Sequence, residues 1–174
     1  VIHQKCLLHL NKLVVNDFGK NTSLLNEYNK YLILNIFYNR EKEIKFLAKL
    51  IKKHEKKSFS DAKEKREWVK EAKQKFREYL RTMENTRRRN GKNLTQRKLF
   101  KAEKIMKNLL EQEALFPKKA RKRLDMIKDN WKYFSAFYHI KDCPATNNAI
   151  ENFYSTSLKT HRKKQLRSDP GIIN

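Results

Sequence analysis

Apolar residues recur at intervals of three and four along most of this 174-residue chain, and this periodicity constrains its fold more than any other feature. Such spacing places apolar side chains along one face of a helix. The whole sequence holds 3 Gly and 3 Pro, so long helices can run without a break. The sequence therefore predicts a mainly helical fold, with internal helices at about residues 24–38, 44–57, 60–86, 99–116 and 120–137.

Local signals predict where these helices begin and end. Thr22 or Ser23 can cap the first and Ser60 the third, because a hydroxyl oxygen there accepts a hydrogen bond from a free backbone N–H. The third helix is expected to be the longest. It leads into Arg87-Arg88-Arg89-Asn90-Gly91, which we expect to be a loop because Asn-Gly is a turn signal. The chain is expected to open as a short strand at Val1–Lys5 that turns into a helix.

The charge balance indicates a polyanionic partner. Lys and Arg total 42 against 19 Asp and Glu, which gives a formal net charge of +23, and nucleic acid is the simplest partner for such an excess. Arg87, Arg88 and Arg89 are candidate DNA contacts. A membrane surface is the alternative polyanion, but no apolar stretch approaches the roughly 18 residues of a membrane span, and no signal-peptide pattern is present. We therefore expect DNA rather than a membrane as the partner.

The two cysteines, Cys6 and Cys143, are too few for a disulfide framework, which favours a reducing cytoplasm. His3, Cys6 and His9 have a spacing that metal ligands can adopt. A structural zinc site needs about four ligands, and His139 and Cys143 are the only plausible distant partners. We favour the simpler interpretation, a buried thiol with ordinary helix histidines, and expect no stoichiometric zinc.

The segment 143–153 carries the most local information. Pro144 cannot continue a helix, and Thr146 or Asn147 can cap a new one. Glu151 then falls in the first turn, where a carboxylate complements the positive end of the helix dipole. That electrostatic role is the simpler interpretation of Glu151. The helix is predicted from the apolar spacing of Ala149, Ile150, Phe153, Tyr154 and Leu158.

Thr146-Asn147-Asn148-Ala149-Ile150-Glu151-Asn152-Phe153 also resembles the signature around the last acidic residue of DDE transposases, in the branch that includes insertion-sequence enzymes and Mutator-like elements. The resemblance implies an RNase H-like fold in which three carboxylates hold two divalent ions, Mg²⁺ or Mn²⁺, with Glu151 as the third carboxylate. Thr146, Asn147 and Asn148 match the polar lead-in to its helix. The family's basic continuation of this helix implies phosphate contacts from Lys159, Arg162, Lys163 and Lys164.

The opening segment His3-Gln4-Lys5-Cys6-Leu7-Leu8-His9-Leu10 is similar to the segment that follows the second catalytic aspartate in the same family. There it belongs to the core near the active site rather than to a zinc finger. The family's first two aspartates precede this segment, and Asp17, which follows it, cannot replace either. Since the chain begins at Val1, we expect a fragment or a truncated reading frame that is inactive alone and binds no metal ion tightly.

The resemblance implies three regions: core at residues 1–38, a basic helical insertion at 39–118, and a return to core with the Glu151 helix at 119–174. The expected fold class is mainly α, the C-terminal part of an RNase H-like α/β core with a large helical insertion. The implied function is DNA binding and metal-dependent strand cleavage and transfer in an intact prokaryotic transposase. Such an enzyme acts on transposon ends and target DNA at the nucleoid, and could form homo-oligomers. The alternative is a non-enzymatic helical nucleic-acid-binding protein or a decayed transposase remnant.

Overall fold

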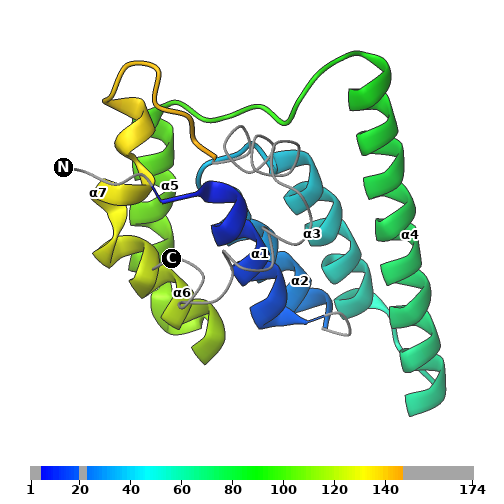
Figure 1. The fold of residues 1–174 in the computed structure, drawn as a ribbon. Helices are drawn as coiled ribbons and strands as arrows, with labels where there is room; N and C mark the ends of the chain where they lie inside the picture. Colours follow the sequence, from blue (N-terminus) through cyan, green and yellow to red (C-terminus); the bar gives the residue numbers. More distant parts are fainter. Residues whose placement is uncertain (1–4, 20–22, 147–174) are drawn as a thin grey trace, which may run out of the picture.

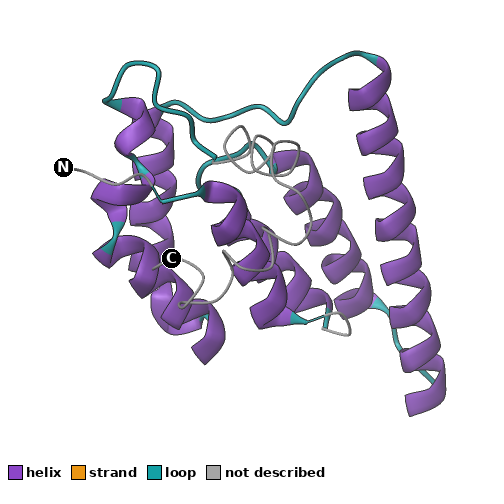
Figure 2. Cartoon of the chain, in the orientation of Figure 1, coloured by secondary structure: helices purple, strands orange, loops and turns teal. Residues whose placement is uncertain are grey.

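The computed structural model describes residues 5–19 and 23–146, and this part of the chain is mainly helical, as predicted (Figures 1 and 2). It contains no named strand; its only β-type pairing is an isolated antiparallel bridge between Tyr38 and Gln96. The helices are α1 (Leu7–Phe18), α2 (Leu24–Leu34), α3 (Glu41–Lys56), α4 (Ala62–Arg89), α5 (Leu99–Glu111), α6 (Lys118–Asp129) and α7 (Trp131–Phe134), with single 3-10 turns η1 (Glu113–Leu115) and η2 (Ala136–Tyr138).

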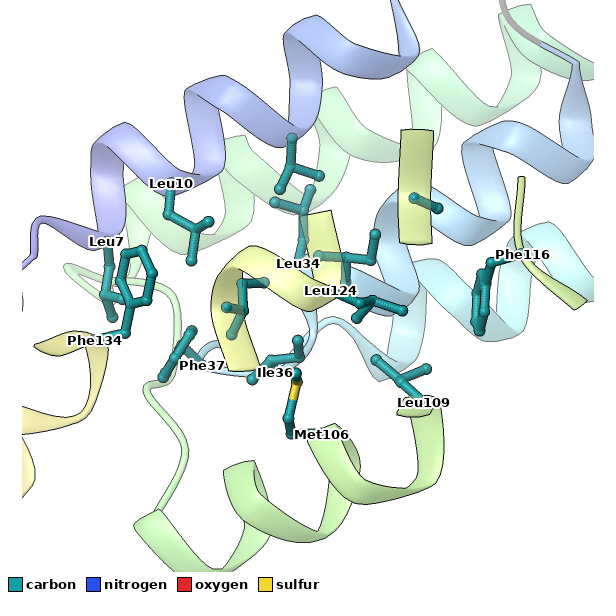
Figure 3. Packing of buried hydrophobic residues seen from close by; sticks show 14 residues of the cluster. Leu7, Leu10, Leu34, Ile36, Phe37, Met106, Leu109, Phe116, Leu124 and Phe134 are labelled. Carbon is teal, nitrogen blue, oxygen red and sulfur yellow. The ribbon is translucent and has the colours of Figure 1, made fainter. Parts of the chain in front are cut away.

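A first hydrophobic cluster joins α1, the end of α2, α5, α6 and α7 (Figure 3). Leu7, Leu124 and Ile127 are fully buried there, and Phe37 stacks on Trp131 with ring centroids 5.4 Å apart. Burying such side chains is the main favourable term in folding. The cluster therefore unites segments from both ends of the described chain, and it includes α5, which belongs to the helical insertion predicted at residues 39–118.

A second cluster joins α2, α3 and α4. Phe76 of α4 meets Tyr31 of α2 edge to face at 5.3 Å, and Phe46 of α3 stacks on Tyr79 of α4 at 4.3 Å. Helix α2 contributes to both clusters, so it connects them. In Figure 1 the helices follow one another from α5 and α6 on one side, through α1, α2 and α3, to α4 on the opposite side.

The segment between α4 and α5 is fastened to the turn after α2 by Arg97. Its side chain is 4% exposed and donates from Nε to the backbone oxygen of Asn35 at 2.8 Å. Its backbone N–H donates to the oxygen of Phe37, and its own carbonyl accepts from the Tyr138 hydroxyl at 2.7 Å. Burial raises the pKa of Tyr138 to about 12. Arg97 therefore holds three separate parts of the chain together.

Several predicted boundaries are wrong. Helix α2 ends at Leu34 rather than near residue 38: the backbone N–H of Ile36 donates to the oxygen of Ile33 in a tighter turn, and the N–H of Asn39 donates to the oxygen of Thr95 outside the helix. The predicted helix 120–137 breaks at Asn130, whose side-chain amide donates to the carbonyl of Met126 at 2.8 Å and so competes with the helical bond. The predicted strand at Val1–Lys5 lies almost wholly outside the described residues.

The two ends of α4 also differ from their predictions. Asp61, not Ser60, is the N-cap: its carboxylate accepts from the backbone N–H of Glu64 at 2.7 Å. Glu64 in turn accepts from the backbone N–H of Ser60, the residue before the cap, so its carboxylate also holds the chain at the start of the helix. At the other end the three arginines 87–89 form the last helical turn rather than a loop, and the turn begins only at Asn90 and Gly91.

Candidate nucleic-acid interface

The outer face of α3 carries six lysines, which we call the lysine face. All six are exposed, and none forms an ion pair within the described part of the chain. They recur at helical spacing along about 21 Å of helix, at a rise of about 1.5 Å per residue. The lysine face consists of Lys42, Lys45, Lys49, Lys52, Lys53 and Lys56.

The glutamates of α3 do not neutralise this face. Glu43 is 1% exposed and lies on the buried side, where its Oε1 atom is 3.2 Å from Arg40 and 3.7 Å from Arg87. Glu41 pairs with Arg97 at 3.1 Å, and the hydrogen bond from that guanidinium lowers the pKa of Glu41. Glu55 is exposed at the margin, one turn from Lys52. The lysine face therefore projects an almost unopposed positive field.

Helix α4 separates its charges onto two edges. One edge, the basic edge, carries cations one turn apart and no carboxylate over that span. Glu67, Glu71 and Glu78 lie on the adjacent edge, where they line a shallow hollow together with Lys70 and Arg77. No member of the basic edge forms an ion pair within the described residues. The basic edge consists of Arg66, Lys70, Lys73, Arg77 and Arg81.

The arginine run at the end of α4, Arg87 to Arg89, is partly neutralised by the fold. Arg87 lies 3.2 Å from Glu84 and 3.7 Å from Glu43, and its side chain is 20% exposed. Arg88 is bound to Glu84 at 3.0 Å, and the hydrogen bonds from Arg88 and Arg87 lower the pKa of Glu84. Arg89 is exposed. Of the three predicted DNA contacts, Arg87 therefore has a structural role, and Arg88 shares its charge with a carboxylate.

Most of the predicted catalytic and motif residues lie outside the described part of the chain. These are His3, Asn147, Asn148, Glu151, Lys159, Arg162, Lys163 and Lys164.

Cys6 is buried at the start of α1, His9 is exposed on that helix, and Thr146 is the last described residue. Cys6 and Cys143 are thiols rather than a disulfide. Residues 5–19 and 23–146 contain no group of three or more His, Cys, Asp or Glu side chains that could hold a metal ion. The backbone N–H of Leu7 donates to the oxygen of Ala145, so the two ends of the described chain meet at α1.

The lysine face and the basic edge were not identified as site residues from the sequence. The sequence predicted both helices, and its overall charge predicted a nucleic-acid partner, but these lysines were not assigned to a particular surface. Plotting each charged residue by its angular position around the helix would have found both surfaces, because the apolar residues already define the buried side.

Comparison of the chain with models of protein families, with curated proteins and with solved structures finds no match. Within the described residues, no helix is long and apolar enough to cross a membrane.

Proposed function

We propose that this chain binds duplex DNA through the lysine face of α3, as the DNA-holding helical part of a DDE-type transposase. The observation that carries DNA binding is the segregation of six exposed lysines onto one face, while two of the three glutamates of α3, Glu41 and Glu43, are engaged with arginines elsewhere. Duplex DNA presents one negative charge per about 1.7 Å of axis. A straight row of lysines about 21 Å long therefore spans enough phosphates to engage all its members.

Binding of this kind positions DNA without reading its sequence. Lysine ammonium groups contact phosphate oxygens, which are the same at every base pair. Each neutralised phosphate releases counterions, so affinity falls steeply as salt is added. In a plot of the logarithm of the binding constant against the logarithm of the salt concentration, each contact adds about −0.9 to the slope. The lysine face alone predicts a slope near −5, and the net charge of +23 adds long-range attraction.

The test is a fluorescence-anisotropy titration of a duplex of about 20 base pairs at several salt concentrations. We expect Lys45, Lys49, Lys52 and Lys56 replaced together by Gln to weaken binding by about 10–100-fold and to flatten the slope by about 3–4. Glutamine keeps helix propensity close to that of lysine, so the fold should persist. The matched control removes the same charge from α5 and α6, by Gln at Lys104, Lys119, Lys122 and Lys128.

The control variant should lose less than about 3-fold in affinity, because long-range attraction is screened beyond about 10 Å in 0.1 M salt. Equal losses in the two variants would mean that net charge, not the lysine face, holds DNA. An affinity independent of salt would remove nucleic acid as the partner.

The catalytic part of the proposal rests on the resemblance of the Thr146–Phe153 and His3–Leu10 motifs to DDE transposases. It includes an RNase H-like core, an Mg²⁺ or Mn²⁺ site to which Glu151 contributes a carboxylate, and a place at the nucleoid of a prokaryotic cell. The described residues offer no set that fits such an ion, so the role of Glu151 needs its own experiment.

That experiment fuses the chain to an upstream segment with two catalytic aspartates from a transposase. Glu151→Gln should lower strand cleavage by about 10²–10³-fold, as loss of one transition-state electrostatic contact does. DNA binding should stay unchanged. Full cleavage by the Gln variant would leave Glu151 as a helix-capping residue. Salt-dependent DNA binding without cleavage by the unsubstituted fusion would favour the alternative, a non-enzymatic helical nucleic-acid-binding protein.

A further inference from the structure

A groove runs beside the basic edge of α4, on the side that faces α1 and α2. Its deeper part has a volume of about 350 Å³ between the three helices, and it continues along α4 as a shallower hollow of about 650 Å³. The two parts share Lys73 and Arg77. The groove therefore has two cations at its centre, on the same helix edge and one turn apart. Glu27 and Lys30 also line the deeper part, but they pair with each other at 2.6 Å, so Lys73 and Arg77 remain the cations without a carboxylate partner in the groove.

The floor of the groove is aliphatic rather than suited to nucleic-acid bases. Val15, Leu24 and Leu80 line the deeper part, and Val69 lines the shallower part. The nearby rings of Tyr31 and Phe76 are 8% and 4% exposed and pack against each other, so their faces cannot stack on bases. An apolar floor with a cationic rim is complementary to aliphatic side chains flanked by carboxylates.

The chain itself carries such an element at the turn between α5 and α6. Leu115 is 81% exposed, which makes it the most exposed large hydrophobic side chain among the described residues. Glu111 and Glu113 precede it, and residues 108–116 contain no Lys or Arg. The closest cation to Glu111 is Lys107, at 3.9 Å. We call residues 111–115 the Leu115 corner; it is an acidic, apolar protrusion on a chain of net charge +23.

We propose that the Leu115 corner of one copy of the chain docks into the α4 groove of a second copy. Leu115 then covers the aliphatic floor, and Glu111 and Glu113 face Lys73 and Arg77. Helices α5 and α6 lie on the side of the molecule opposite α4, so one chain cannot fill its own groove (Figure 1).

The contact is therefore head to tail, and repeated contacts extend the assembly instead of closing a dimer. A single protruding leucine and two ion pairs make a small interface, below the roughly 1,000 Å² typical of stable complexes. Self-association is accordingly weak and depends on protein concentration. This proposal is independent of DNA binding, which uses the lysine face.

Sedimentation velocity on nuclease-treated protein at about 10–300 μM tests it without nucleic acid. The weight-average mass of the wild type should rise above 21.1 kDa with concentration. Arg77→Glu in the groove and Glu113→Lys in the corner should each keep the protein monomeric, because each places like charges opposite one another. The double variant, which exchanges the two charges, should associate again.

Two controls make the same charge changes elsewhere. Lys75→Glu lies on another side of α4 and Glu103→Lys lies on α5, both at exposed positions, and both should associate like the wild type. Leu115→Ser should also abolish association without affecting thermal stability, because the side chain is exposed. A constant mass of 21.1 kDa for the wild type, equal effects of Arg77→Glu and Lys75→Glu, or no recovery in the double variant would each overturn the proposal.

Discussion

The lysine face of α3 and the arginine run of α4 both have strongly basic sequences, yet the fold treats their charges differently. The six lysines are exposed and form no ion pair within the described residues. Two members of the arginine run contact carboxylates. Glu84 accepts hydrogen bonds from Arg87 and Arg88, and the buried Glu43 lies beside Arg87. A row of positive charges therefore becomes a binding surface or part of the architecture according to where the nearby carboxylates point.

Residue chemistry explains the division. Arginine presents a planar fork of donors that can satisfy carboxylates on two sides, so it suits the partly buried position between α3 and α4. Lysine carries a strongly hydrated point charge on a flexible stem and remains in water at low cost. The arginine at the end of α4 should therefore matter for stability, and the lysines for binding.

The largest expected effect is on stability, where the buried carboxylate Glu43 and the exposed carboxylate Glu84 should differ. Glu43→Gln should lower the free energy of unfolding by about 2–3 kcal/mol, because Arg40 loses its carboxylate partner and Arg87 keeps only the exposed Glu84. Both arginines keep about a fifth of their side-chain area exposed, so the loss is smaller than for a fully buried pair. Urea denaturation followed by circular dichroism measures it.

Glu84→Gln is the matched control for this variant. Its carboxylate also binds Arg87, but Glu84 is 48% exposed, and exposed ion pairs contribute about 0–1 kcal/mol. We therefore expect a much smaller loss of stability than for Glu43→Gln. If both variants lose the same stability, the distinction between the buried and exposed members of the arginine cluster is wrong.

The sequence predicted the helical architecture well because the apolar spacing follows directly from which side of each helix is buried. Leu47 and Leu50 of α3, and Phe76 of α4, all lie in the second cluster. The long-range partners were not predictable in this way. Nothing in the local pattern around Arg97 distinguishes it from the other arginines, yet it is buried against Asn35, 62 residues away in the chain.

Capping and charge pairing show a second limit. Ser60 and Asp61 are both favourable caps, and only the approach of the Asp61 carboxylate to the Glu64 amide decides between them. The Asn-Gly turn was recognised, but the helix runs through Arg89 because Glu84 binds arginines one turn later. Such competition between nearby groups depends on distances that a residue pattern does not contain.

A smaller effect is expected on DNA affinity. Glu84→Gln should raise the affinity for a duplex of about 20 base pairs by about 2–3-fold, because Arg88 is released to contact phosphate. Glu103→Gln on α5 changes the net charge equally and should raise the affinity less. If the two variants bind DNA equally well, Glu84 does not reduce the contribution of Arg88 to DNA binding.

The smallest effect concerns the other end of α4, where a carboxylate acts on the helix start rather than on arginines. Glu64 accepts from the backbone N–H of Ser60 at 2.7 Å, and this bond, with those from Lys57 and the Ser60 hydroxyl, lowers the pKa of Glu64 to about 2. Folding lowers the pKa of this carboxyl group, so the ionised group stabilises the native state at pH values above its ordinary pKa near 4.5. This stabilisation is lost as the pH falls toward 2.

The Ser60 amide resonance should therefore shift in NMR spectra with a midpoint near pH 2. Glu64→Gln should abolish that titration, whereas Glu67→Gln, one turn further along α4, should preserve it. A midpoint near 4.5 in the wild type would show that the Glu64 carboxylate is solvated like any surface group, and that the first turn of α4 depends on Asp61 alone.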